Sequence, residues 1–494
     1  MYGEEKSDSL IVAANLANNP QGAESVERRS GAKGNAEQPH MRRTQSRESM
    51  SQRLSRVREA AKQRKKERFT ALFHLLTAEA LENAFLSLSR KAAAGVDGVR
   101  WKDYAENLKV NIADLHRRLH QGSYRAQPGR RHYIPKADGK QRPLGIASLE
   151  DKIVQYALVK ILNAVYENDF MGFSYGFRPG RSQHNALDAL ATGLVRTNVN
   201  WVLDADISQF FDKVSHEWLI RFIEHRIGDQ RVIRLIRKWL TAGTSEEGEW
   251  RASEEGTPQG AVISPLLANI YLHYVFDLWA HQWRRRHATG NVVMVRYADD
   301  IVIGFDKRID AQCFRIAMQR RLKEFGLTVH PKKTRLMEFG RFAAENRASR
   351  GKGKPETFNF LGFTHISGKD RSGRFMLIRK TRRDRMTATL KAIKDGLRKR
   401  WHYSIPEQGK WLRRVVQGYL NYHSVPGNYP MMRKFRIYVT DLWRRALRRR
   451  SQQDDTTWTK ANRLAAVWLP KVRVLHPWPV ERFTARHPRQ EPGA

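Results

Sequence analysis

The sequence of 494 residues holds 90 Lys and Arg against 50 Asp and Glu, a formal charge of +40. This excess exceeds what solubility requires and predicts a polyanionic partner, with nucleic acid as the first candidate. The single cysteine, Cys313, excludes a disulfide framework and any zinc site built from several cysteines of this sequence. An acidic membrane surface is the competing partner, but no run of about 18 apolar residues and no signal-peptide core is found, so we expect a soluble cytoplasmic protein.

Residues 1–60 are polar and rich in Ser, Arg, Gln and Glu. Such a segment buries too little apolar surface to fold by itself, so we predict a disordered basic arm. Ordered structure should begin near Phe69, and helical stretches with one basic hairpin should occupy residues 61–194.

The basic hairpin is predicted around Asp138-Gly139, because this dipeptide is a strong hairpin-turn signal. It places Lys136, Lys140 and Arg142 on the two arms, where their cations can hold a triphosphate. A hairpin whose basic side chains are only solvated is the alternative when this segment is considered alone.

The segment over residues 201–212 predicts an apolar strand that carries acids and runs into a Phe-Phe pair. Asp204 and Asp206 share one of its faces, because side chains alternate along a strand. Phe211 follows five residues after Asp206. The alternative to a functional site is a strand end with a solvated aspartate.

Two glycines, Gly256 and Gly260, flank Pro258-Gln259 before an apolar helix that should start near Ser264. Glycine lets the backbone approach a base pair closely, so this turn is a candidate nucleotide contact. A structural turn into a core helix is the alternative, and it is compatible with that role.

The most informative segment is Tyr297-Ala298-Asp299-Asp300, which stands between two apolar runs and predicts a β-hairpin with its acids at the tip. Two adjacent carboxylates repel each other unless a cation or a change in protonation relieves them. Together with the acidic strand that carries Asp206, this hairpin predicts a divalent metal site. A pair of such ions can stabilise the attacking and leaving oxygens of phosphoryl transfer.

Strand patterns stop after Arg379, and apolar residues then recur at three- and four-residue spacing, which predicts a helical bundle. Between Lys380 and Arg450 there are 20 Lys or Arg against four Asp or Glu. This excess favours a nucleic-acid-binding surface over the alternative of a solvated helix face. The tail over residues 451–494 contains three tryptophans and is a candidate DNA-binding extension.

The order of these motifs resembles the reverse transcriptases encoded within bacterial group II introns, also called intron-encoded maturases. The resemblance covers residues from about 70 to 450, and an ordered series is far more specific than any one motif. It is carried by the segments AGVDGV at 94–99, IPKADGKQRPLGI at 134–146, FSYGFRPGRS at 173–182, GTPQGAVISPLLANIYL at 256–272, YADD at 297–300, HPKKT at 330–334 and FNFLGF at 358–363.

This resemblance implies an α+β fold with the right-hand architecture of polymerases. Fingers and an antiparallel-sheet palm would be followed by an α-helical thumb, or maturase domain. The implied divisions are fingers at 61–194, palm with the catalytic site at 195–378, thumb at 379–450, and a small DNA-binding tail at 451–494.

The resemblance also implies the roles of individual residues. Asp206, Asp299 and Asp300 would be catalytic, and together with Ile207 they would form a metal site for two Mg²⁺ ions. Lysine near the phosphates or primer is typical of the family at the position of Lys332-Lys333, but the sequence does not choose between these two residues, and a solvated loop is the alternative.

Nucleotide and RNA contacts follow from the same resemblance. Lys136, Arg142, Phe211 and Gln259 would contact the incoming nucleotide. Phe211 would exclude a 2′-hydroxyl and Gln259 would lie at the nascent base pair, although Phe is also a common core residue. Intron RNA would be bound by a basic set on the helical region, namely Arg444, Arg445, Arg448 and Arg449.

The function implied is an RNA-directed DNA polymerase that binds group II intron RNA to assist splicing and copies it into DNA. Its partners would be intron RNA, an RNA template with a DNA primer, target DNA and deoxynucleoside triphosphates, in a bacterial cytoplasm and on the nucleoid when bound to DNA. No HNH endonuclease domain with paired cysteines is expected in these residues. The alternatives are a related reverse transcriptase of phage defence or CRISPR adaptation, and an RNA-binding splicing cofactor without polymerase activity.

Overall fold

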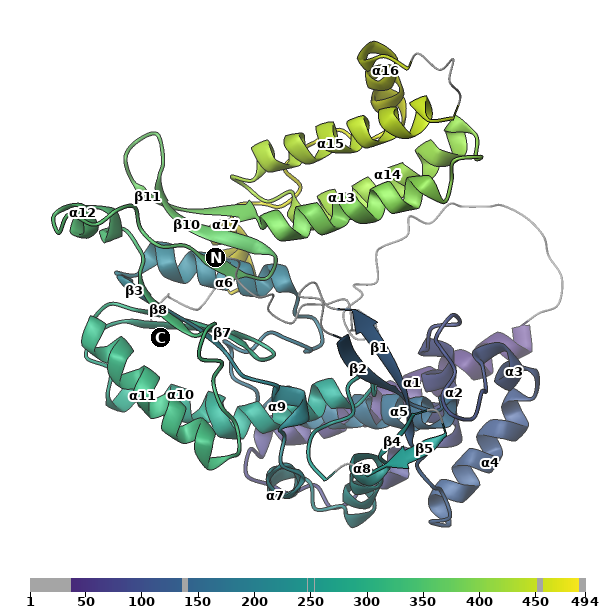
Figure 1. Ribbon diagram of the computed structural model, residues 1–494. Coiled ribbons are helices and arrows are strands. Elements are labelled where there is room, and N and C mark those ends of the chain that lie inside the picture. Colours follow the sequence, from purple (N-terminus) through teal and green to yellow (C-terminus); the bar gives the residue numbers. More distant parts are fainter. Residues whose placement is uncertain (1–36, 136–140, 247, 253, 451–455, 488–494) are drawn as a thin grey trace.

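The computed structural model describes residues 37–487, apart from 136–140, 247, 253 and 451–455. It is a mixed α and β structure, as predicted, with three sheets among the described residues. Figure 1 shows a body of helices and strands with a group of long C-terminal helices at the top of the view. No helix in this part of the chain has the length and apolar character needed to cross a membrane.

The N-terminal region combines helices with a four-stranded sheet of order β2-β1-β4-β5. Its helices are α1 (Glu37–Gln63), α2 (Ala78–Ser87), α3 (Trp101–Glu106), α4 (Leu108–His120) and α5 (Leu149–Tyr166). Its strands are β1 (Gly129–Pro135), β2 (Gln141–Ile146), β4 (Thr244–Glu246) and β5 (Glu249–Arg251). The pairing of β1 with β2 is the predicted basic hairpin, in which Arg142 lies opposite Ile134. Its turn, with Lys136 and Lys140, lies outside the described residues.

Helix α1 corrects the prediction of a disordered arm over residues 1–60, which is wrong for residues 37–60. Ala61 is fully buried, and Met50, Leu54 and Val57 pack against the same core. These four residues recur at helical spacing and form one narrow apolar stripe, which the polar composition of the segment conceals. Residues 1–36 lie outside the described part of the chain.

A four-stranded antiparallel sheet of order β6-β7-β3-β8, called the central sheet below, carries the acidic strands. Its strands are β3 (Trp201–Asp206), β6 (Val292–Tyr297), β7 (Asp300–Phe305) and β8 (Arg335–Glu338). Around it lie α6 (Gln183–Arg196), α7 (His216–Arg226), α8 (Gln230–Thr241), α9 (Ser264–Leu272), α10 (Leu278–Arg286), α11 (Arg308–Glu324) and α12 (Ala343–Ala348).

Helices cover both faces of the central sheet, since α6 packs on β6 and β7 while α11 packs on β3 and β7. Alternation along β3 sends Val202 into the core formed with α6 and Leu203 into the core formed with α11. Burial on both faces explains why these strands appear as continuous apolar runs. Asp206, at the end of β3, is therefore a charged residue among mostly apolar, buried neighbours.

A three-stranded sheet leads into the C-terminal helices. Its strands are β9 (Phe358–Phe360), β10 (Phe363–Lys369) and β11 (Phe375–Thr381). The helices are α13 (Arg383–Arg398), α14 (Ile405–His423), α15 (Tyr429–Arg448), α16 (Trp458–Trp468) and α17 (Pro479–Arg486). The predicted bundle is confirmed, because Ile393, Phe435 and Val439 are buried in a separate core that α13 to α16 share.

The C-terminal tail packs on helix α6, which covers one face of the central sheet. Helix α17 packs on α6, and Arg482 forms an ion pair with Asp188 of that helix. His476 stacks on His184 with 3.9 Å between ring centroids. The segment predicted as a DNA-binding extension thus also joins the helical region to α6.

Candidate active site

The central sheet brings the three predicted catalytic aspartates together. Asp206 ends β3 and lies opposite Asp300, the first residue of β7. Asp299 belongs to the two-residue turn between β6 and β7, which confirms the predicted hairpin with acids at its tip. All three residues are buried, with exposed fractions of 4% for Asp206, 8% for Asp299 and 2% for Asp300.

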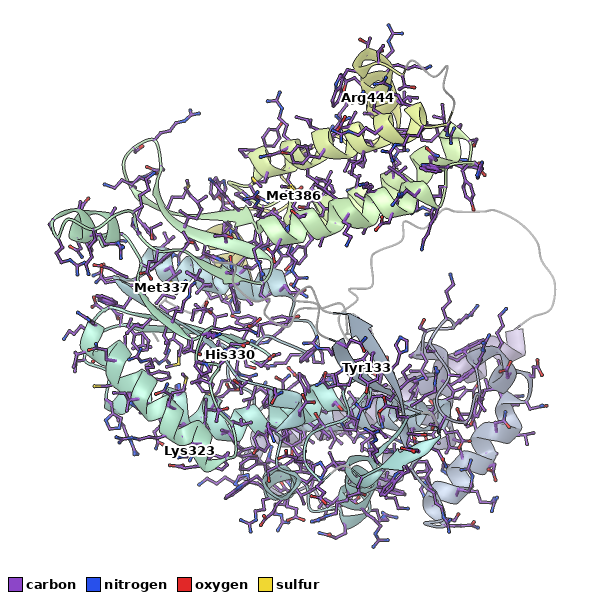
Figure 2. The ribbon with its side chains drawn as sticks, in the orientation of Figure 1. Tyr133, Lys323, His330, Met337, Met386 and Arg444 are labelled. Carbon is purple, nitrogen blue, oxygen red and sulfur yellow. The ribbon has the colours of Figure 1, made fainter. Side chains whose placement is uncertain are left out.

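A lysine lies beside this acidic end of the sheet. Lys333 Nζ is 3.4 Å from Asp206 Oδ2, and the backbone N–H of His330 donates to the Asp206 carbonyl at 2.7 Å. Lys332 is exposed. The structure therefore distinguishes the two lysines that the sequence left open and places Lys333 next to a carboxylate. Figure 2 shows His330 beside the central sheet, far from Arg444 in the C-terminal helices.

The acids form an open set of ligands. In the described part of the chain, no three His, Cys, Asp or Glu side chains form a cluster that could hold a metal ion by themselves. Carboxylate oxygens are nevertheless the donors that Mg²⁺ prefers, and Mg²⁺ usually takes only one or two carboxylates and completes its shell with water and substrate phosphates. Asp206 and Asp299 fit a cation of that kind. Ile207 follows Asp206, and its side chain is buried in the core.

The turn that carries Asp299 has an unusual backbone. Ala298 adopts a left-handed conformation with φ of +55°, which non-glycine residues seldom occupy. Gly176 packs directly on this turn, because a Cβ atom at residue 176 would lie 2.3 Å from the Ala298 nitrogen. The FSYGFRPGRS segment therefore packs against the backbone of the acidic turn.

Two predicted nucleotide contacts lie on adjoining loops. Phe211 is half-buried in a short 3₁₀ turn over Phe210–Asp212, and its carbonyl accepts from the Thr257 N–H at 2.7 Å. Gln259 Nε2 donates to Asp212 Oδ1 at 2.7 Å. Gly256 makes this approach possible, since it has φ of +86° and a Cβ there would lie 2.9 Å from the Phe211 carbonyl oxygen.

The hairpin that carries Arg142 reaches the same loop. The Gly145 N–H of β2 donates to the Gln259 carbonyl at 2.7 Å, so the two elements are joined through the backbone. Arg142 itself is half-buried three residues earlier on β2. Among the predicted nucleotide contacts, the structure thus connects Arg142, Gln259 and Phe211, whereas Lys136 lies outside the described residues.

The four arginines predicted to bind RNA lie at the end of α15 but differ in their surroundings. Arg444 is paired with Asp441 at 2.9 Å and lies over the Trp458 ring at 4.9 Å. Arg445 pairs with the same aspartate at 2.7 Å but is itself exposed. Arg448 and Arg449 are exposed. Three of the four are thus accessible to a ligand, whereas Arg444 is half-buried.

One buried group near the site was missed by sequence reasoning. Arg296, within the strand that leads to the acidic turn, has an exposed fraction of 0% and pairs with Asp277. Its only signal in the sequence is a charged residue in an apolar strand. Its partners come from distant segments, which the sequence does not bring together.

The site lies within a segment that is similar to known proteins. Residues 134–365 match the family described as reverse transcriptase (RNA-dependent DNA polymerase). The chain is 43% identical to protein YkfC of Escherichia coli (strain K12) over 206 residues, which cover 41% of this chain and 54% of YkfC. It is 37% identical to the group II intron-encoded protein LtrA of Lactococcus lactis subsp. cremoris over 223 residues, 44% of this chain and 37% of LtrA.

The chain is also 26% identical to the putative COX1/OXI3 intron 1 protein of Saccharomyces cerevisiae over 393 residues. This longer alignment covers 66% of this chain and 46% of that protein. The alignments thus span about half or less of the length of these relatives. The chain contains a reverse transcriptase domain. Over the aligned parts it is similar to a group II intron-encoded protein and to an intron protein, in agreement with the resemblance drawn from its motifs.

Proposed function

We propose that this chain is an RNA-directed DNA polymerase encoded by a group II intron, which binds intron RNA to assist splicing and copies it into DNA during retrotransposition. The observation that carries this proposal is the meeting of Asp206, Asp299 and Asp300 at one end of two adjacent strands inside the reverse transcriptase domain. A protein that only bound RNA would have no use for three buried acids at that place. Its cellular place would be the bacterial cytoplasm, on the nucleoid when bound to DNA.

The right-hand architecture is part of this proposal. Residues 61–194, joined by α1, would be the fingers, and residues 195–378 with the central sheet would be the palm. The helices from α13 to α15 would be the thumb, or maturase domain. Support comes from the separate core of these helices and from the change at Thr381–Arg383, where the last strand ends and α13 begins.

Asp206, Ile207, Asp299 and Asp300 would hold the metal, for which we propose two Mg²⁺ ions. When bound, such ions stabilise the negative charge on the attacking and leaving oxygens of phosphoryl transfer. The three carboxylates are fixed by strands and a tight turn rather than by mobile loops. Enzymes catalyse phosphoryl transfer mainly by positioning the reacting groups and stabilising charge, and the protein does little covalent chemistry. Rigidly placed carboxylates suit that mode of catalysis.

The remaining residues would select and orient the nucleotide. Arg142, with Lys136, would bind the triphosphate through charge-assisted hydrogen bonds. Phe211 would lie beneath the sugar and exclude a 2′-hydroxyl, and Gln259 would contact the nascent base pair. The hydrogen bonds from Thr257 to Phe211 and from Gly145 to Gln259 support this arrangement, because they hold both loops by their backbones.

Primer extension tests the proposal directly. A DNA primer annealed to an RNA template is incubated with the full chain, deoxynucleoside triphosphates and Mg²⁺, and cDNA is measured. We expect extension that depends on all three components. Binding of intron RNA without any extension would instead establish a splicing cofactor, and a gene without an intron ribozyme around it would favour a role in phage defence or CRISPR adaptation.

A further inference from the structure

We propose that Arg296 is a positioning residue of the polymerase reaction. Its buried guanidinium holds the left-handed turn at Ala298 and thereby aims the carboxylates of Asp299 and Asp300. This inference rests on the proposed function and adds to it a residue that touches neither nucleotide nor primer. Its basis is a set of hydrogen bonds through which Arg296 connects the buried Asp277 to the turn at Ala298.

The inner end of the set is a buried ion pair. Arg296 and Asp277 each have an exposed fraction of 0%. Arg296 Nε donates to Asp277 Oδ1 at 2.7 Å and Nη2 donates to Oδ2 at 2.6 Å, so both carboxylate oxygens are engaged. A two-point contact between a planar guanidinium and a carboxylate fixes the orientation as well as the position of the arginine.

The outer end of the set is the turn itself. Arg296 Nη1 donates to the Ala298 carbonyl oxygen at 3.0 Å. Ala298 is the residue with φ of +55°, and the peptide that this carbonyl belongs to leads into Asp299. A hydrogen bond to that oxygen therefore stabilises the rare conformation that sets the direction of the next two side chains.

A second route connects Arg296 to the same turn. Nη1 also donates to Asn269 Oδ1 at 3.1 Å, and Asn269 Nδ2 donates to the Gly176 carbonyl at 2.7 Å. Nη2 donates to Ser174 Oγ at 2.7 Å. Since Gly176 packs against the Ala298 nitrogen, the arginine controls both the turn and the backbone that lies behind it.

The helix that supplies the acid has a local irregularity at this point. Residues His273–Asp277 form a π-helical turn between α9 and α10, and Asp277 is its last residue. Single π-turns inside α-helices occur frequently at functional sites. Burial lowers the pKa of His273 to about 4. This neighbour is therefore neutral at pH 7 and adds no positive charge that would compete with Arg296 for Asp277.

A comparison with another buried arginine separates positioning from stability. Arg226 has an exposed fraction of 1% and pairs with both oxygens of Asp169, at 2.7 and 3.3 Å. It also donates to backbone carbonyls, those of Arg64 and Glu67. Its contacts join α7 to the end of α1 and do not include the acidic turn, so Arg226→Lys is a matched control for the loss of a buried guanidinium.

The test compares full-length Arg296→Lys with Arg226→Lys in primer extension. Lysine keeps a positive charge beside Asp277 but lacks the planar fork that reaches Ala298 and Asn269 together. We expect kcat to fall at least tenfold in Arg296→Lys and the Mg²⁺ concentration for half-maximal rate to rise. The affinity for template–primer should stay within twofold of wild type. Arg226→Lys should lower Tm without this fall in kcat.

Adding Ala298→Gly provides the decisive arm. Glycine occupies the left-handed region without the steric cost that alanine meets, so it should favour the productive turn when the arginine is changed. We expect Arg296→Lys/Ala298→Gly to regain about fivefold in kcat over Arg296→Lys. No gain, or an equal kcat loss in Arg226→Lys, would overturn the inference and leave Arg296 with a role in stability only.

A third variant covers the case in which Arg296→Lys does not fold. Asn269→Ala leaves the ion pair of Arg296 with Asp277 in place and removes the hydrogen bonds of Asn269 to Arg296 and to Gly176, so a smaller loss of kcat, also relieved by Ala298→Gly, is expected. An Asn269→Ala enzyme that folds with wild-type kcat would contradict the inference. Absence of extension by the wild-type chain would instead refute the proposed polymerase activity, whichever variant is compared.

Discussion

The region around the proposed active site and the C-terminal helices use arginine in different ways. Arg178 and Arg296 have exposed fractions of 2% and 0%, and each is paired with a carboxylate, Glu167 or Asp277. On α15, by contrast, Arg433 and Arg448 are exposed, and the whole segment from Lys380 to Arg450 has 20 Lys or Arg against four Asp or Glu.

The difference lies in what surrounds the charge. A buried, paired arginine loses its hydration and gains fixed directions, so its effect is on geometry. An exposed arginine with few acids nearby keeps its hydration and its long-range field, so its effect is on the binding of polyanions. Changes at the first kind of site should therefore reduce kcat, whereas changes at the second should reduce RNA affinity and its dependence on salt.

The largest effect is expected from the proposed metal ligands. Asp206→Asn or Asp299→Asn removes one carboxylate charge, and the loss of about 4 kcal/mol of transition-state stabilisation corresponds to about a thousandfold in rate. Single-turnover primer extension measures this loss, and Asp370→Asn, on the turn between β10 and β11, is the matched control. RNA affinity should be retained in all three variants. A rate within tenfold of wild type for either Asp206→Asn or Asp299→Asn would remove these residues from the site.

A backbone change that leaves every charge intact should have the next largest effect. In Gly176→Ala the new methyl group would lie 2.3 Å from the Ala298 nitrogen, so the turn or its support must move. Displacement of catalytic groups by about 1 Å can lower the rate about a hundredfold. Gly172→Ala is the control, because its Cβ would meet nothing within 4 Å. Equal kcat values for the two variants would show that the turn tolerates movement.

The acidic residues and the hydrogen-bond network of Arg296 differ in how well the sequence predicts them. The acidic hairpin and the strand that carries Asp206 were predicted because apolar runs and turn residues have local signals, and their register follows once the strands pair. The network of Arg296 was not, because its partners at Ser174, Asn269 and Asp277 are separated by many residues and meet only in the folded chain. Lys333 could not be distinguished from Lys332 for the same reason.

The error over α1 has a different cause. Composition is an average over a segment, and the apolar residues of this stripe hardly change the average over residues 1–60. Their spacing, however, is enough to place one side of a helix against the core. The C-terminal tail presents the same difficulty, since only the fold shows that Arg482 meets Asp188 of α6.

Phe211 should affect selectivity more than rate. Phe211→Val shortens the side chain that would lie beneath the sugar, so incorporation of ribonucleotides relative to deoxynucleotides should rise roughly tenfold or more, in the range that pocket sterics provide. The ratio of kcat/KM for the two substrates, measured in primer extension, gives this number. Phe222→Val is a control for loss of a large aromatic side chain away from the nucleotide. An unchanged ratio in Phe211→Val would indicate that Phe211 serves only as packing.

The arginines at the end of α15 are expected to affect RNA affinity more than the polymerase rate. Replacing Arg444, Arg445, Arg448 and Arg449 with Ala should weaken binding to structured intron RNA, and the slope of log affinity against log salt should flatten by about 0.7 to 0.9 for each RNA phosphate that the variant no longer neutralises. Most of that change is expected already in Arg448→Ala/Arg449→Ala, since Arg444 is held by Asp441 and Trp458.

The control for this variant is Arg234→Ala/Arg237→Ala, which removes two exposed arginines from α8. Extension of a short primer–template at low salt should fall much less than RNA affinity, because the proposed metal site lies on the central sheet and not on α15. If the α15 variants keep the wild-type affinity and salt slope, these arginines form a solvated face. Exposure and excess positive charge on α15 would then be insufficient to identify an RNA-binding surface.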